Sequence, residues 1–101
     1  MKISLVDEAL ELVASTPMNE KSSPGHAARL NNLAVAYQSQ NRLQEADDLY
    51  RESRSIWEEQ LGSDHPKIAL SLCNRSSLCR LLGVYNEAER LHQLALRIWD
   101  K

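Results

Sequence analysis

Two asparagines, Asn32 and Asn74, are the residues of this chain best suited to binding chemistry. A carboxamide carries both a hydrogen-bond donor and an acceptor, so it can hold a peptide backbone whatever side chains the peptide has. The two residues are 42 positions apart, in segments of similar sequence. This recurrence indicates that the chain presents one polar group twice.

The asparagines belong to an internal repeat that covers most of the chain. Residues 65–99 align with residues 23–57 without a gap, and nine of the 35 aligned positions are identical. Unrelated sequences would share about two, so the chain is a tandem array and its helices must be considered as copies. The identical pairs include Pro24 and Pro66, Asn32 and Asn74, Glu45-Ala46 and Glu87-Ala88, and Ile56-Trp57 and Ile98-Trp99.

Residues that commonly catalyse reactions are not arranged for that purpose. The three histidines, His26, His65 and His92, do not recur in phase. Glu87 and Glu89 fall on different faces of the expected helix, unlike a pair of catalytic carboxylates. The sequence has no glycine-rich phosphate loop. We therefore expect neither an enzyme nor a bound cofactor.

The two cysteines, Cys73 and Cys79, are also expected to be structural. Six residues of helix separate them by about 9 Å along the axis and turn their side chains apart, which prevents a disulfide. Their spacing is not that of a zinc site. We expect them to be buried or half-buried, with no metal bound.

Composition restricts the class of protein. With 101 residues, 43% of them hydrophobic, no Phe and three Gly, the chain is expected to form one all-α domain. A formal net charge of −2 argues against nucleic acid or an anionic membrane as partner. No apolar run approaches the ~20 residues that cross a bilayer, and Asp7 and Glu8 interrupt the apolar start before it resembles a secretion signal. We expect a cytoplasmic or nuclear protein.

Apolar residues at spacings of three and four predict about five helices. Residues 3–15 form an amphipathic helix that we interpret as half of an upstream repeat. Residues 23–60 and 65–100 each form a pair of helices, and residues 16–22 form a polar linker without periodicity. The apolar face of the first helix comprises Ile3, Leu5, Val6, Ala9, Leu10, Leu12 and Val13.

The start of each pair carries a helix signal. Ser23 before Pro24, and Asp64 or His65 before Pro66, can cap free amide groups while proline occupies the first turn. Gly62 is expected to end the second helix of the first pair.

The corner within each pair is also marked. Asn41 and Gly83 suit the left-handed conformation that ends a helix. Two-residue corners make each pair antiparallel, and the small residues Ala46 and Ala88 mark the closest crossing.

These residues resemble a tetratricopeptide repeat. The pattern consists of Leu30, Ala34, Tyr37, Ala46 and Tyr50. The 42-residue spacing, Leu30-Asn31-Asn32-Leu33-Ala34 and the segment from Gln60 to Pro66 are similar to the kinesin light chain type. The resemblance implies a right-handed α-solenoid of antiparallel helix pairs, here one half repeat and two full units. It departs from the pattern at Arg75-Ser76, where Leu-Ala is usual, and at Cys79 and His92, where Tyr is usual, so we expect a weaker core in the second unit.

Such a solenoid has a concave groove lined by the first helix of each pair, which suits a peptide or a helix of a partner. The resemblance implies that Asn32 and Asn74 contact the backbone of that ligand. The alternative is that both asparagines cap or bridge neighbouring helices. The full set expected to face the groove is Ala28, Asn31, Asn32, Val35, Gln38 and Ser39 in the first unit, and Leu70, Cys73, Asn74, Ser77, Arg80 and Leu81 in the second.

Three arginines suggest an acidic ligand. Arg29, Arg75 and Arg80 can add charge complementarity, as the resemblance implies, although helix arginines are more often simply solvated. Ala28 occupies the place where repeats that capture a terminal carboxylate carry lysine, so that mode of binding is not expected.

The last helix is expected to leave an apolar face uncovered. Trp57 and Trp99 recur at the ends of the second helices, where packing against the next unit is the expected role. No further unit follows Trp99, so the chain is either a piece of a longer array or covers this face with a copy of itself. The inward residues of this helix are expected to be Tyr85, Ala88, Leu91, Ala95, Leu96 and Ile98, and the stacking face comprises Leu91, Leu96, Ile98 and Trp99.

The sequence thus supports three hypotheses of different classes. The preferred one is a protein-interaction module that acts as an adaptor or scaffold by binding a peptide in the groove. The alternative is a structural module that stacks or self-associates through its ends. A small hydrolase or metal protein has the least support.

Overall fold

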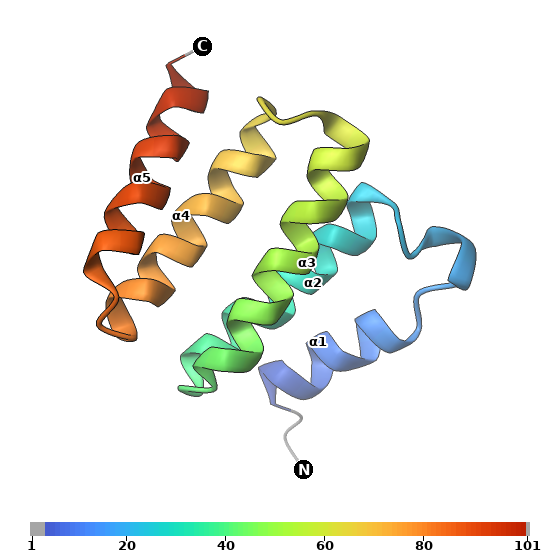
Figure 1. Cartoon of the computed structure of the whole chain (residues 1–101). Helices are drawn as coiled ribbons and strands as arrows, with labels where there is room; N and C mark the ends of the chain where they lie inside the picture. Colours follow the sequence, from blue (N-terminus) through green and yellow to red (C-terminus); the bar gives the residue numbers. More distant parts are fainter. Residues whose placement is uncertain (1–3, 101) are drawn as a thin grey trace.

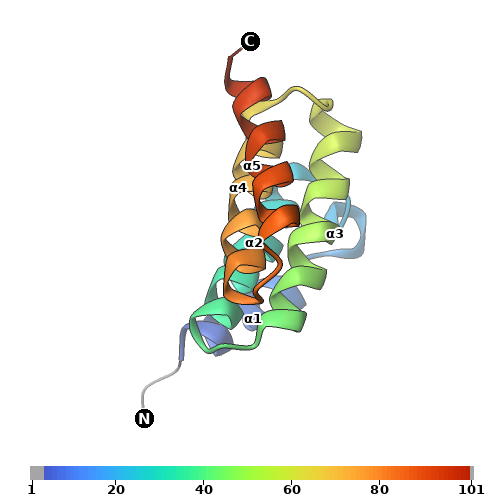
Figure 2. The same ribbon diagram turned by 60° about the vertical axis from the view of Figure 1, so that its left-hand side comes forward.

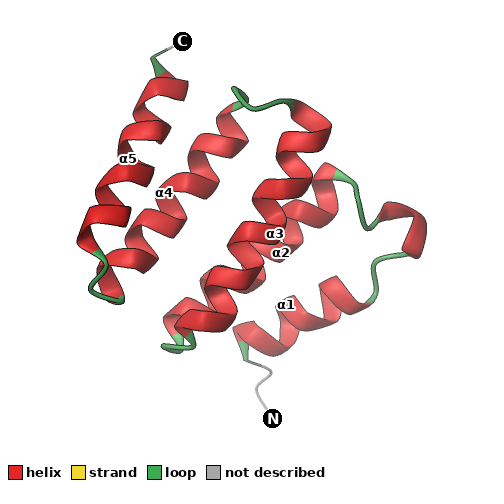
Figure 3. Ribbon diagram, viewed as in Figure 1, coloured by secondary structure: helices red, strands yellow, loops and turns green. Residues whose placement is uncertain are grey.

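The computed structural model describes residues 4–100, and those residues form five α-helices and one short 3-10 helix (Figures 1 and 3). The predicted all-α fold is therefore confirmed. Ile3, placed in the first helix from the sequence, lies outside the described residues. The elements are α1 (Leu5–Ala14), η1 (Met18–Glu20), α2 (Pro24–Ser39), α3 (Leu43–Leu61), α4 (Pro66–Leu81) and α5 (Tyr85–Trp99).

The helix starts follow the predicted capping. The Ser23 hydroxyl accepts a hydrogen bond of 3.1 Å from the His26 amide, at the start of α2. Of the two candidates before α4, the cap is His65, whose Nδ1 accepts from the Lys67 amide at 3.1 Å. Both bonds satisfy amides that lack a partner within the helix.

The corners within the pairs are left-handed, as predicted. Asn41 has a φ of 62° and Gly83 a φ of 80°, and Gly62, after α3, has a φ of 90°. Only residues that tolerate a positive φ allow the chain to reverse so tightly.

The segment before α2 is more ordered than the expected polar linker. It contains η1, and the Thr16 side chain is buried. The Thr16 hydroxyl donates to the Leu12 carbonyl at 3.0 Å and accepts from Arg29 Nη1 at 2.9 Å. These bonds join α1, the connecting segment and α2.

The helices are stacked in chain order, with α1 and α5 at opposite ends (Figures 1 and 2). Helix α2 packs against α1, α3 and α4, and α4 packs against α3, α5 and α2. The stack is thin, with extents of 42 × 31 × 16 Å. The first helices of the two pairs therefore lie next to each other.

Two hydrophobic clusters hold the stack together, and each one crosses from one pair to the other. One joins Ala27 and Trp57 of the first pair to α4 and α5. The other joins Val6 of α1 and six buried residues of α2 and α3 to Leu78 of α4. Because both clusters include α4, the two pairs do not have separate cores.

Several side chains that periodicity placed inside are on the surface. In α1 only Val6 is buried, whereas Leu5, Leu10 and Leu12 are exposed. Tyr85 at the start of α5 is 69% exposed, contrary to its expected inward position. A helix at the end of a stack contacts one neighbour, so a narrower stripe of its surface is covered.

Arg75 and Ser76 occupy buried positions that are apolar in the first pair, Leu33 and Ala34. Arg75 is 7% exposed, and its Nε donates to Asp47 Oδ1 at 2.9 Å. Ser76 donates to the Ala88 carbonyl at 2.6 Å, where α4 crosses α5. The expected weakening of the second unit is thus offset by hydrogen bonds, because each buried polar group has a partner.

Asp47 supplies the counter-charge for the buried Arg75. Its other oxygen, Oδ2, accepts from Arg51 Nε at 3.0 Å. We expect Asp47→Ala to lower the free energy of unfolding by about 3 kcal/mol, because it leaves the Arg75 guanidinium buried without its counter-charge. Urea unfolding of the full chain, followed by circular dichroism, measures this change.

The double variant Asp47→Ala/Arg75→Leu is the matched control. It restores the leucine found at the same position of the first pair, so most of the lost stability should return. If the losses of unfolding free energy in the single variants Asp47→Ala and Arg75→Leu simply add in the double variant, the two residues are not coupled. This account of the second unit would then be wrong.

Candidate binding groove

One face of the stack carries adjoining shallow hollows formed by α1, α2, α3 and α4. The first, the α1/α2 hollow, has a volume of about 340 Å³. The second, the α2/α4 hollow, has a volume of about 380 Å³. The lining of the α1/α2 hollow is Leu5, Glu8, Ala9, Leu12, Asn32, Val35, Ala36 and Ser39. The lining of the α2/α4 hollow is Val35, Gln38, Ser39, Tyr50, Asn74, Ser77 and Leu81.

Val35 and Ser39 line both hollows, which therefore adjoin across α2. Asn32 lies in the first and Asn74 in the second, so the two asparagines are on a common face of the molecule. We refer to the two hollows together as the groove. Its floor is mainly apolar, with a few polar groups among aliphatic side chains, which is the usual make-up of a ligand site.

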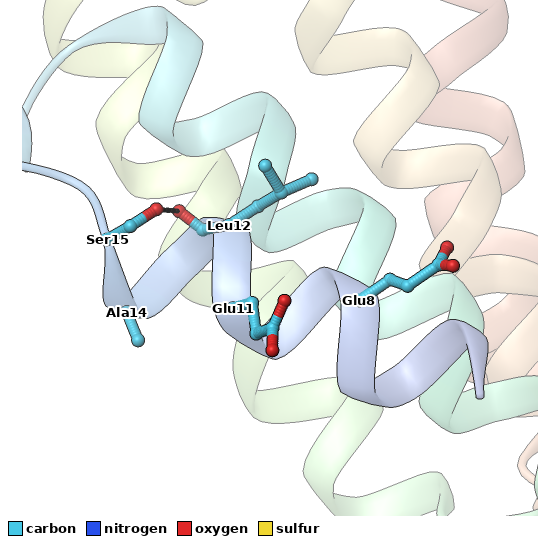
Figure 4. A pocket seen from close by; sticks show the side chains of 5 residues that line it. All are labelled: Glu8, Glu11, Leu12, Ala14 and Ser15. Atoms are coloured by element: carbon cyan, nitrogen blue, oxygen red, sulfur yellow. Dashed lines mark hydrogen bonds between the residues drawn. The ribbon is translucent and has the colours of Figure 1, made fainter. Parts of the chain in front are cut away.

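The groove extends over α1 into an open depression of about 730 Å³ that includes Ala14 and Ser15 (Figure 4). Glu8 and Leu12 line this depression as well as the α1/α2 hollow, and Figure 4 shows their side chains leaving α1 on the same side. Glu11 also lines the depression. The carboxylates of Glu8 and Glu11 have no hydrogen-bond or ion-pair partner among residues 4–100. This end of the groove is therefore acidic.

The two asparagines differ in their surroundings. Asn32 is exposed to solvent. Asn74 is half-buried, and its Nδ2 donates to Asn31 Oδ1 at 3.1 Å. Asn31 itself is buried between the helices, so its expected place in the groove is wrong. For Asn74 the bridging alternative describes the contact that is present, because its hydrogen bond to Asn31 joins α4 to α2.

The arginines do not line the groove. Arg29 is half-buried and donates to Thr16, and Arg75 is buried against Asp47. Arg80 is exposed but lines neither hollow. The geometry therefore does not support an acidic ligand, because the unpaired charged group that lines the groove within residues 4–100 is the Glu8 carboxylate.

The other expected residues divide into three groups, one of which is Leu70 alone, exposed but lining neither hollow. Val35, Ser77 and Leu81 are exposed and line the groove, and Gln38 lines it while accepting a hydrogen bond of 2.9 Å from the Tyr50 hydroxyl. Ala28 and Cys73 instead pack against the core. The sequence reasoning did not place Leu5, Glu8, Leu12 or Tyr50 in the groove. Treating the half repeat as a neighbour of α2 would have found the three α1 residues.

A comparison with protein families identifies the chain. The family model described as tetratricopeptide repeat matches residues 25–101. The chain belongs to the tetratricopeptide repeat family. A comparison with curated proteins gave no match. Repeats of this family are generally protein–protein interaction modules.

Two further findings concern the described part of this tetratricopeptide repeat chain. Within residues 4–100, no three His, Cys, Asp or Glu side chains lie close enough together to hold a metal ion. No helix there is both long and apolar enough to cross a membrane.

The last tetratricopeptide helix, α5, leaves only part of its expected stacking face open. Trp99 is 52% exposed and Leu96 is also exposed, whereas Ile98 is half-buried against the core. Leu91 is 0% exposed, so its expected place on the open face is wrong. Leu91 points towards α4 because α5 uses that side to close the second pair.

Trp57 shows how the same position is covered in the first pair. It is 1% exposed, clusters with Ile68, Ala69 and Leu72 of α4, and donates from Nε1 to the Pro24 carbonyl at 3.2 Å. The predicted structural role of Trp57 is confirmed. Trp99 differs because no described helix follows α5.

Tyr50 gives the groove a titratable group. Burial raises the pKa of its hydroxyl to about 12, because the phenolate would lose its hydration. The neutral hydroxyl is then favoured in the folded state. Its stabilising effect is complete below the unfolded pKa near 10 and is lost as pH rises through about 12.

We expect the ultraviolet titration of the folded chain to show a tyrosine transition near pH 12, and Tyr50→Phe to remove it. Tyr85→Phe, on the exposed surface of α5, is the matched control and should leave that transition in place. Folding must be followed in parallel by circular dichroism. Titration of Tyr50 at the ordinary tyrosine pKa with the helices intact would contradict the burial.

Proposed function

We propose that this chain is a protein-interaction module that binds a peptide or helix of a partner along the groove, as an adaptor or scaffold does. The observation that carries the proposal is the continuity of the α1/α2 and α2/α4 hollows across Val35 and Ser39. Family membership supports it, because tetratricopeptide repeats generally bind proteins. The 42-residue spacing supports placing the chain in the kinesin light chain type.

The exposed Asn32 carboxamide is the group we propose to hold the ligand backbone. Its donor and acceptor have no partner in the described chain, so a peptide can use both. Asn74 contributes the part of its carboxamide that Asn31 does not use. Val35 and Leu81, both exposed, provide apolar contacts at the centre and the α4 end of the groove.

The charge of the groove indicates what the ligand carries. Among the described residues, the unpaired charged groups of the lining are Glu8, which lines the α1/α2 hollow, and Glu11, which lines the adjoining depression, so we propose an apolar ligand with a basic residue near α1. This replaces the acidic ligand suggested by the arginines in the sequence, since Arg29 and Arg75 are engaged elsewhere. Charges at the edge of an interface mainly affect the association rate and partner choice, so this preference should weaken with salt.

A library of peptides of mixed charge, screened against the full chain, tests the binding proposal. Val35→Glu should weaken the selected peptides about tenfold or more, because it places a charge on the apolar floor. Asn32→Ala should weaken them by about tenfold through loss of hydrogen bonds to the backbone. Fluorescence anisotropy measures both effects.

Gln93→Ala is the matched control, since Gln93 is exposed on α5 and lines neither hollow. Asn74→Ala is less informative alone, because it also leaves Asn31 buried without its partner. Peptides that bind equally well to the Val35→Glu variant would show that the groove is not the site.

We also propose self-association through α5 as a second candidate function. The observation in its favour is the contrast between Trp99, 52% exposed, and its repeat equivalent Trp57, 1% exposed. The proposed face comprises Leu96 and Trp99, since Ile98 packs against the core. A second copy would cover it by burying the same apolar groups on both chains.

Sedimentation equilibrium at increasing protein concentration tests this second proposal. The wild-type chain should show a rising average mass, and Trp99→Asp should stay monomeric because a buried unpaired carboxylate opposes association. Val35→Glu, in the groove, should leave the mass unchanged. A wild-type chain that remains monomeric at every concentration would exclude self-association.

A further inference from the structure

A separate pocket between α3 and α4 gathers three arginines. Its lining is Arg51, Arg54, Ser55 and Glu58 of α3 and Arg75 of α4, and its volume is about 320 Å³. None of these residues lines the groove. The pocket is also mainly polar, unlike the groove.

Arg75 is the most buried residue of this pocket and lies at its base. Its side chain is nearly buried, and Nε is held by Asp47. Its two terminal nitrogens donate to no described residue. Among the described residues, only Nδ1 of His26 is both fully enclosed and without a hydrogen-bond partner. The terminal nitrogens of Arg75 also lack a partner, so they cannot be fully enclosed. They are therefore open to the pocket that Arg75 lines.

The two other arginines are oriented in the same way. Arg51 binds Asp47 through Nε, and Arg54 binds Glu58 through Nε. Their terminal nitrogens are also left without a described acceptor. The three guanidinium groups and the carboxylates of Asp47 and Glu58 leave one excess positive charge and several free donors. The Glu87 carboxylate also interacts electrostatically with Arg75 and Arg51, but it is itself paired with Arg90.

Stability does not explain why an arginine occupies position 75. The first pair has Leu33 there, and a buried ion pair is generally no more stabilising than a well-packed apolar pair. The ion pair does hold a guanidinium in one orientation at the base of an open pocket. Rigid, planar guanidinium groups are well suited to binding several oxygens of a phosphate group.

We propose that the α3/α4 pocket binds a phosphate monoester, with Arg75 as the anchoring residue and Arg51, Arg54 and the Ser55 hydroxyl as further donors. Glu58 is the opposing group, and its pairing with Arg54 reduces the repulsion. The phosphate group can be that of a phosphorylated side chain on a partner protein or that of a free small molecule. The pocket does not depend on the groove for this role.

Nuclear magnetic resonance of the arginine Nε–H groups in the full chain tests the proposal. Inorganic phosphate, phenyl phosphate and a phosphoserine peptide are titrated separately at constant ionic strength, with chloride as the reference salt. Saturable shifts at Arg75 and Arg54 are expected. Tighter binding of the phosphoserine peptide than of inorganic phosphate would identify a phosphorylated protein as the source, and equal or weaker binding would identify a free phosphate compound.

Variants distinguish this site from general charge screening. Arg54→Gln, at the protein surface, should weaken phosphate binding about tenfold, as expected for loss of a charge-assisted contact. The double variant Asp47→Ala/Arg75→Leu, which keeps an apolar core, should abolish the saturable shifts. Arg42→Gln, which removes an arginine paired with Glu45 outside the pocket, should have no effect. Shifts that do not saturate, or that Arg42→Gln reduces as much as Arg54→Gln does, would overturn the proposal.

Discussion

The packing of α3 against α4 is the contact on which the rest of the structure depends. Trp57 is buried there against α4, and its indole N–H bonds the Pro24 carbonyl at the start of α2. Ser71 of α4 donates to the Tyr50 carbonyl of α3 in the same interface. These contacts join consecutive pairs into one stack, because an isolated pair would leave an apolar face in water. They also place α4 beside α2 and thereby form the α2/α4 hollow.

The second pair keeps this packing with a different set of side chains. Arg75 and Ser76 replace an apolar pair of residues, and their partners are supplied by Asp47 and by the Ala88 carbonyl. A buried polar group is tolerated only where a partner meets it, so these substitutions are tied to their neighbours. The Arg75–Asp47 ion pair also positions a guanidinium beside the α3/α4 pocket. This ion pair therefore belongs both to the core and to the lining of that pocket.

The groove and the end of α5 share a physical cause. Helices inside the stack have neighbours on both sides, whereas α1 and α5 have one. The uncovered side of α1 adds Leu5, Glu8 and Leu12 to the groove and makes that end acidic. The uncovered side of α5 exposes Trp99. The ends of the stack therefore decide both the charge of the proposed ligand site and the proposed self-association face.

The sequence by itself determined the repeat, the helices and the corners. Pro24 and Pro66, Asn41 and Gly83, and the apolar spacing act locally, through backbone conformation and helix periodicity, so their effects can be predicted from neighbouring residues. Only the tertiary structure decided which polar groups are paired and which side of each helix is covered. Asn31 and Asn74 bond each other, Arg75 meets Asp47, and Leu91 turns towards α4, all through residues distant in the chain or on another helix. Such pairings depend on how the helices pack in three dimensions, which periodicity along a single helix does not specify.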